Sequence, residues 1–241
     1  MAILEDVSHL KTLKAFIITI FLIKIQSKLF RFYNQSVTLI NILIYLITNN
    51  NLLLPYYQKK LLEAGTDEAG RGCYAGAVFA AAVILPRTYN NKWINDSKKL
   101  TATQRNELRV EIEKHAIAFA IASSSVAEID STNILAASIM AMHRAILALA
   151  TQPQYIIVDG NRFTNYPNIP HQTIIKGDGL YASIAAASIL AKTERDAYML
   201  HLHHQYPLYN WASNKGYGTL EHRKAIAANG LCMHHRKSFN I

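Results

Sequence analysis

Four acidic residues stand close to glycines, at or just beyond the ends of segments whose composition indicates strands: Asp67, Glu68, Asp159 and Asp178. Because glycine lets another backbone or a ligand come close, carboxylates at such positions make a reasonable metal or phosphate site. Ligands that are all oxygen favour Mg²⁺ or Mn²⁺ over zinc. Two such cations about 4 Å apart can stabilise the attacking and leaving oxygens of a phosphodiester. The pattern therefore predicts metal-dependent phosphodiester chemistry.

A simpler explanation exists for each carboxylate taken alone, because aspartates before glycine commonly form turns. Asp67 and Glu68 also pose a geometric difficulty, since neighbouring residues in a strand face opposite sides. Both can serve one site only if the strand ends or bulges there, or if one binds through its main-chain carbonyl. The glycine turn that follows, residues 70–72, makes this feasible. Carboxylates gathered in one site repel one another, so at least one pKa should be raised.

The elements that would position these residues follow from composition and periodicity. Strands are predicted over residues 63–68, 77–85, 116–126, 155–159 and 173–175. Helices are predicted over residues 101–114, 133–150, 183–204 and 219–229. Thr101 and Gln104 form a capping box for the first helix, and Asp130 or Ser131 is expected to cap the second. Early strands with tight connections, then alternating helices and strands, predict a single α/β domain over residues 52–241, with a mixed sheet flanked by helices and a C-terminal helical segment.

Residues 1–51 differ sharply in composition from the rest, being dense in Ile, Leu, Phe and Asn without glycine or proline. Three explanations compete. The apolar runs 15–23 and 37–48 suggest a membrane anchor, but each is shorter than the roughly 20 residues that span a bilayer. A signal peptide would need a small-residue cleavage site, which does not follow. We therefore expect an atypical extension, such as a start site placed too far upstream, with no stable membrane partner.

The charge balance points to a polyanionic partner. Lys and Arg number 25 against 16 Asp and Glu, a net charge of +9. Residues 1–54 contribute +3 of this, so the remainder still carries +6. Such a basic balance favours nucleic acid as a partner. Residues that could grip phosphates, with ordinary solvated surface as the alternative for each, are Lys98, Lys99, Lys176, Lys192, Lys215 and the Arg236-Lys237 pair.

The number and spacing of the cysteines indicate the redox state of the compartment in which the protein folds. There are only two, Cys73 and Cys232, too few for a disulfide framework and without zinc-site spacing. They indicate a reducing compartment, and we expect a cytoplasmic protein that is monomeric. Cys73 is expected to be a small buried residue rather than a nucleophile.

The sequence resembles the ribonuclease HII family, the bacterial type 2 ribonucleases H. The likeness runs from about residue 53 to the C-terminus, and its ordered blocks are together highly specific. The most distinctive are Asp67-Glu68-Ala69-Gly70-Arg71-Gly72, Asp96-Ser97-Lys98-Lys99-Leu100, Asp159-Gly160-Asn161-Arg162, Lys176-Gly177-Asp178, Lys215-Gly216-Tyr217-Gly218-Thr219 and His235-Arg236-Lys237-Ser238-Phe239. The family often has proline where this chain has Cys73 and Ala77.

The resemblance implies a ribonuclease H-like fold and an endoribonuclease acting on RNA–DNA hybrids. It also implies incision 5′ to single ribonucleotides in duplex DNA, leaving 3′-hydroxyl and 5′-phosphate ends, as in the removal of misincorporated ribonucleotides and RNA primers. In the family, the positions of Asp67, Glu68, Asp159 and Asp178 form a site for Mg²⁺ or Mn²⁺. The turn Gly70-Arg71-Gly72 contacts the ribose 2′-hydroxyl, the group that distinguishes RNA from DNA. The tyrosine at the position of Tyr217 stacks at the RNA–DNA junction, and Lys98, Lys176 and Lys192 are expected to contribute substrate contacts.

Two other functions remain open on the sequence. A catalytically silent hybrid-binding protein would use the basic surface without turnover, although four clustered negative charges hinder binding of a polyanion unless cations fill the site. A resolvase-like nuclease with the same fold would act on branched DNA and need no 2′-hydroxyl.

Overall fold

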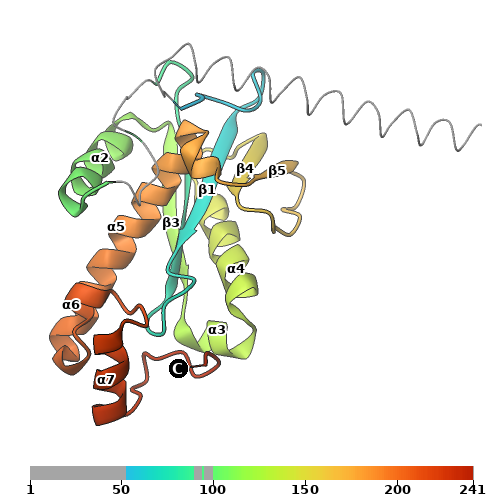
Figure 1. The fold of residues 1–241 in the computed structure, drawn as a ribbon. Helices are drawn as coiled ribbons and strands as arrows, with labels where there is room; N and C mark the ends of the chain where they lie inside the picture. The colour runs from blue at the N-terminus through green and yellow to red at the C-terminus, as the bar shows by residue number, and fades with distance from the viewer. Residues whose placement is uncertain (1–52, 90–93, 95–99, 241) are drawn as a thin grey trace, which may run out of the picture. The chain divides into compact units, whose positions relative to one another are not determined.

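Five strands form one mixed sheet in the order β3-β2-β1-β4-β5 in the computed structural model, which describes residues 53–89, 94 and 100–240 (Figure 1). The expectations for residues 1–51 and for Lys98 and Lys99 lie outside these residues. The strand bounds are β1 Glu63–Ala69, β2 Val78–Ile84, β3 Ala118–Ser124, β4 Tyr155–Asp159 and β5 His171–Ile174. The α/β class and the mixed sheet predicted from the sequence are confirmed.

The central position of β1 follows from its pairings. β1 pairs with β2 antiparallel, so that the turn between them returns the chain directly, and β2 pairs with β3 in the same way. β4 lies parallel to β1 on its other side, and β5 lies parallel to β4. The carboxyl ends of three parallel strands, β1, β4 and β5, therefore meet at one edge of the sheet, where the acidic residues occur.

Helices cover both faces of the sheet. Their bounds are α2 Ala102–His115, α3 Val126–Ser131, α4 Ile134–Leu147, α5 Ala182–Gln205, α6 Trp211–Asn214 and α7 Leu220–Asn229, with short 3₁₀ segments η2 Gly177–Gly179 and η3 Pro207–Tyr209. Residues of α5 and α2 pack on one face of the sheet, and α4 packs on the other (Figure 1). The result is a three-layer helix–sheet–helix core.

α5 lies unusually close to the centre of the sheet because the facing residues are small. A Cβ atom on Gly65 of β1 would stand 2.4 Å from the backbone nitrogen of Ile184, so only glycine fits there. The facing surface of α5 continues with Ala185, Ala186 and Ser188, all buried. Carboxylates at the end of β1 are thus brought within reach of α5 side chains.

The predicted cap of the long helix is wrong. Asn133 is the cap of α4, and its side chain accepts the N–H of Ala136 at 2.9 Å. Asp130 and Ser131 belong instead to α3, a short helix absent from the prediction. Ser125 and Glu128 form a capping box that starts α3, and this local signal outweighs the alanine-rich pattern downstream. α4 also ends at Leu147, three residues before the predicted limit.

The remaining predicted elements agree closely with the structure. The capping box of Thr101 and Gln104 is present at the start of α2. Thr219 caps α7 by accepting the N–H of His222 at 3.2 Å.

Within residues 53–89, 94 and 100–240, no helix has the length and apolar content needed to cross a bilayer.

Candidate active site

The ends of β1 and β4 place two acidic residues side by side. Thr66 pairs with Val158 in the parallel register of these strands. The next residue on each strand is acidic, Asp67 on β1 and Asp159 on β4. Parallel pairing therefore brings together two carboxylates that lie far apart in the sequence.

Asp67 is deeply placed, with 4% of its surface exposed. Its Oδ1 accepts the backbone N–H of Glu68 at 2.7 Å, and its side chain is hydrogen-bonded to Ser188 of α5. Burial raises the pKa of Asp67 well above its ordinary value, and the charges of Glu68 and Asp159 raise it further. A buried carboxylate under such repulsion gains stability from any cation that it binds.

Glu68 faces the same group of charges although it is adjacent to Asp67. Both residues lie within β1, which ends at Ala69, but the pairing of β1 with β4 already stops at Thr66. Arg71 Nη1 donates to Glu68 Oε1 at 3.1 Å. Burial raises the pKa of Glu68, the Arg71 guanidinium opposes that rise, and Asp159 adds to it. Adjacent positions in the strand thus do not prevent Asp67 and Glu68 from both interacting with the charge of Asp159.

Asp178 lies beyond the neighbouring strand, in η2, and is 4% exposed. The residue before it, Gly177, donates its backbone N–H to Asp159 Oδ1 at 2.7 Å. This bond holds η2 at the end of β4. Asp178 therefore comes one residue after a direct contact to Asp159. Asp67, Glu68 and Asp159 interact electrostatically, and Asp178 belongs to the adjoining turn.

The donor set suits a hard cation, since all four side chains offer carboxylate oxygens. Within the described part of the chain, however, no three Asp, Glu, His or Cys side chains are already spaced to hold a metal ion. Glu68 is instead paired with Arg71. The residues fit Mg²⁺ or Mn²⁺ by chemistry and charge, and side chains must rearrange when the ion binds.

The turn at residues 70–72 lies directly beside these carboxylates. Gly70 has φ +98°, and a Cβ atom there would stand 1.9 Å from Nε of Arg195. Arg71 and Gly72 are exposed. In the described part of the chain, the backbone N–H groups of Arg71 and Gly72 have no acceptor. The turn therefore offers backbone donors and one guanidinium to a ligand.

Tyr217 stands on the same side of the fold as the turn. Cys73 forms a bridge with Tyr217, and the thiol and the phenol are hydrogen-bonded. The ring is 42% exposed, and the Arg195 guanidinium lies 6.0 Å from its centre. The structure thus brings an exposed aromatic ring to the turn, and Cys73 is buried, as expected.

The predicted phosphate contacts divide into one exposed lysine and several side chains that already have protein partners. Lys176 is exposed, just before η2. Lys192 is only partly exposed and forms an ion pair with Asp196, its neighbour one turn later on α5. Lys215 Nζ donates to the carbonyl of Ala212 at 2.6 Å. The suggestion that Arg236 grips phosphate is wrong, because this side chain is fully buried.

The sequence does not predict that Arg195 and Arg236 are buried behind the turn. Arg195 donates to the main-chain carbonyls of Ala75, Ala77 and Lys215. Arg236 donates to those of Gly70, Arg71 and Gly76. Arg195 had no distinguishing signal, since it lies in a helix among other charged residues. The motif at residues 235–239 is the only local signal for Arg236, and by composition alone this arginine has the character of a surface charge.

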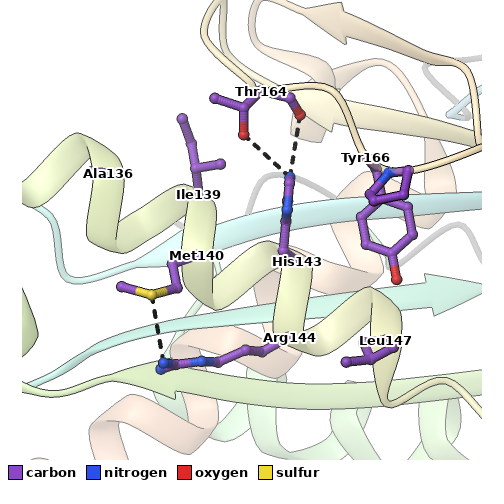
Figure 2. A pocket seen from close by; sticks show the side chains of 9 residues that line it. Ala136, Ile139, Met140, His143, Arg144, Leu147, Thr164 and Tyr166 are labelled. Carbon is purple, nitrogen blue, oxygen red and sulfur yellow. Dashed lines mark hydrogen bonds between the residues drawn. The ribbon is translucent and has the colours of Figure 1, made fainter.

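A surface pocket of about 690 Å³ lies between α4 and the loop before β5. Figure 2 shows its lining, where His143 Nε2 lies 3.2 Å from the carbonyl oxygen of Thr164 and Arg144 reaches toward Met140. The lining is mainly apolar and includes none of the predicted site residues. This pocket is separate from the carboxylate group.

The family model and the curated relatives identify one family, and the solved structures show a shared fold. The family model described as Ribonuclease HII matches residues 64–241. Ribonuclease HII of Bacteroides thetaiotaomicron is 60% identical over 190 residues, 79% of this chain and 95% of that protein. The ribonuclease H2 structure from Pyrococcus horikoshii is similar in fold, with TM-score 0.64 and 22% identity over 74% of this chain and 93% of the other. The ribonuclease HII of Archaeoglobus fulgidus, solved in complex with PCNA, gives TM-score 0.62 and 25% identity over 75% of this chain and 96% of the other.

Proposed function

This chain belongs to the ribonuclease HII family and is a ribonuclease acting on RNA–DNA hybrids, and we propose that it also incises duplex DNA 5′ to single embedded ribonucleotides. The products would carry 3′-hydroxyl and 5′-phosphate ends. Such an activity would remove misincorporated ribonucleotides and RNA primers. The observation that carries the proposal is the position of the exposed turn Arg71-Gly72 directly beside the carboxylates of Asp67, Glu68 and Asp159.

The carboxylates are assigned to hydrolysis. Enzymes of this family depend on divalent metal ions, and Asp67, Glu68, Asp159 and Asp178 would hold Mg²⁺ or Mn²⁺ here. Such an ion neutralises charge on the phosphate and lowers the pKa of water. Asp67, fixed by Ser188 and by the N–H of Glu68, keeps one orientation through the reaction. Glu68 is held by Arg71 before substrate binds and can leave that partner afterwards.

Recognition of ribose is assigned to the turn. A 2′-hydroxyl both donates and accepts hydrogen bonds. The N–H groups of Arg71 and Gly72, which have no acceptor among the described residues, supply donors, and the ion pair of Arg71 with Glu68 links that residue to the carboxylates. A ribose bound at the turn would thus have its neighbouring phosphate near the acidic group. Deoxyribose would leave the same donors without a partner, which is costly in a closed site.

The other predicted contacts would position the substrate rather than distinguish ribose from deoxyribose. Tyr217 offers a face on which a base at the RNA–DNA junction can stack. Lys176 is placed to contact a phosphate, and Lys192 contributes less because Asp196 already binds it. The enzyme is proposed to act as a monomer. Both cysteines are free, consistent with a cytoplasmic enzyme.

The test uses the full chain and two matched duplexes, one with a single ribonucleotide and its all-DNA twin, each with and without Mg²⁺ or Mn²⁺. We expect cation-dependent nicking only of the first duplex, at the 5′ side of the ribonucleotide. Binding without nicking would identify a silent hybrid-binding protein. Nicking of both duplexes alike would overturn the assignment of ribose recognition to the turn.

A further inference from the structure

Arg236 is a fully buried arginine whose guanidinium is surrounded by carbonyl oxygens of the turn that follows β1. Nη2 donates to the carbonyls of Gly70 at 2.7 Å and Gly76 at 2.8 Å. Nη1 donates to the carbonyl of Arg71 at 2.9 Å, and Nε donates to that of Gly76 at 2.9 Å. The Arg236 side chain thus binds the first two residues and the last residue of the segment 70–76.

The direction of these bonds decides which side of the turn faces outward. The carbonyl oxygens of Gly70 and Arg71 point inward to the guanidinium. The N–H groups of Arg71 and Gly72, which lack an acceptor in the described part of the chain, are left for a ligand. Arg236 therefore sets which backbone groups the turn presents.

Among the described residues, no other side chain donates to the carbonyls of Gly70 or Arg71. Arg195 supports the flanks, donating to the carbonyls of Ala75, Ala77 and Lys215. It makes no hydrogen bond to Gly70 or Arg71 among the described residues. In that part of the chain neither arginine has a carboxylate within ion-pair distance.

Burying an unpaired guanidinium is unfavourable, and this structure offsets it with carbonyl acceptors and an aromatic ring. The Phe239 ring lies 5.2 Å from Cζ of Arg236. Desolvation lowers the pKa of Arg236 to about 10, so the group stays charged at neutral pH. A lysine could not serve in its place, because its single nitrogen cannot reach three carbonyls in a planar fork.

We propose that Arg236 is a positioning residue for ribose selectivity: it orients the turn at residues 70–72 so that this turn distinguishes ribose from deoxyribose. The inference rests on the proposed function, in which that turn reads the 2′-hydroxyl. Arg236 itself contacts no substrate, because it is fully buried behind the turn.

The test compares Arg236→Lys in the full chain with the wild type and with Arg87→Lys as control. Arg87 also donates to a backbone carbonyl, that of Leu61 at 3.1 Å, but it lies past the opposite end of β2. Two constants are measured in Mg²⁺: KM for the duplex with one ribonucleotide, and the inhibition constant of its all-DNA twin. Their ratio is the ribose selectivity.

For Arg236→Lys we expect a higher KM and an unchanged inhibition constant, so that selectivity falls by about tenfold, the effect of one lost charged hydrogen bond. Arg87→Lys should keep the wild-type ratio. A purely structural role would lower the active fraction and hence kcat, leaving both constants unchanged, and that result would overturn the proposal.

A second variant keeps the proposal testable if Arg236→Lys does not fold. Phe239→Leu keeps apolar packing at the C-terminus but removes the ring beside the guanidinium. It should lower selectivity in the same direction by a smaller factor, and an unchanged ratio would count against the proposal.

The wild type and Arg71→Ala separate the two levels of inference. If the wild type shows no selectivity for ribose, the proposed function of the turn is wrong. Arg71→Ala keeps the backbone N–H groups and removes only the guanidinium, so it should lower selectivity without abolishing it. If the wild type is selective while Arg236→Lys and Phe239→Leu keep the full selectivity, only the positioning role of Arg236 fails.

Discussion

His235 and His222 lie with their Nε2 atoms 3.2 Å apart, and both imidazoles are fully buried. His222 Nδ1 donates to the carbonyl of Tyr217 at 2.9 Å, so its Nε2 must accept, and it does so from Trp211 Nε1 at 3.0 Å and from His235. His235 Nδ1 in turn accepts the N–H of Cys232 at 3.0 Å. Both rings are therefore neutral in this network, which holds the backbone of Tyr217.

This network predicts a loss of stability in acid. Burial, with a smaller effect from the neighbouring His222, lowers the pKa of His235 from its ordinary 6.5 to about 4. The unfolded chain takes up a proton at His235 below pH 6.5, whereas the folded protein does so only near pH 4. The contribution of neutral His235 to the free energy of unfolding is thus fully present above pH 6.5 and is lost as the pH falls from 6.5 to 4.

Urea unfolding at pH 6.5 and pH 5 measures that loss. His235 alone should lower the free energy of unfolding by about 2 kcal/mol across this interval. His235→Gln should remove that part of the pH dependence, while His201→Gln, at an exposed position on α5, should retain the wild-type dependence. Equal pH dependence in the wild type and His235→Gln would contradict the neutral assignment.

Two glycines of one turn should respond differently to alanine. Gly70→Ala combines φ +98° with a Cβ atom 1.9 Å from Arg195 Nε, whereas a Cβ atom on Gly72 would meet nothing within 4 Å. We expect Gly70→Ala to lower the free energy of unfolding by more than about 2 kcal/mol, and Gly72→Ala to change it little. Thermal unfolding of both variants without substrate tests this, and similar melting temperatures would contradict the close packing of Arg195 on Gly70.

Asp67→Asn should separate activity from stability. The amide keeps the shape of the side chain but removes a charge that burial and two neighbouring carboxylates disfavour. With divalent cations removed by EDTA, we expect the free energy of unfolding to rise by about 1 kcal/mol. Turnover in Mg²⁺ should fall by at least about a hundredfold. Asp159→Asn should also lose turnover, whereas Glu221→Gln, at an exposed position on α7, should keep it. Full activity of Asp67→Asn would remove this residue from the site.

Lys176 and Lys192 should contribute unequally to the salt dependence of duplex binding. Each phosphate contact adds about 0.9 to the slope of log K against log salt concentration. Lys176→Gln should lower the slope by about that amount, because the side chain is exposed. Lys192→Gln should lower it less, since Asp196 binds that ammonium. Binding of the all-DNA duplex measured from low to moderate salt gives both slopes, and equal decreases would contradict the difference.

The acidic residues were predictable because strand ends and glycines are local signals. Asp67, Glu68 and Asp159 each stand at the end of a recognisable strand, and parallel strands meet at one edge. What could not be predicted depended on contacts over long separations. Arg236 has the composition of a surface residue, and only the fold shows that it reaches the carbonyls of residues 70–76. The cap of α4 failed for a different reason, since Ser125 with Glu128 and Asn133 offered two competing starts nearby.

The bond from Arg236 to Gly70 joins residues 166 positions apart and has a consequence for biosynthesis. Synthesis runs from the N-terminus, so the five described strands and the carboxylates are all made before Arg236. A nascent chain can thus pair its strands before it contains the side chain that binds the carbonyls of Gly70, Arg71 and Gly76. A sheet completed at that stage would still lack the orientation of the turn on which the proposed ribose selectivity depends.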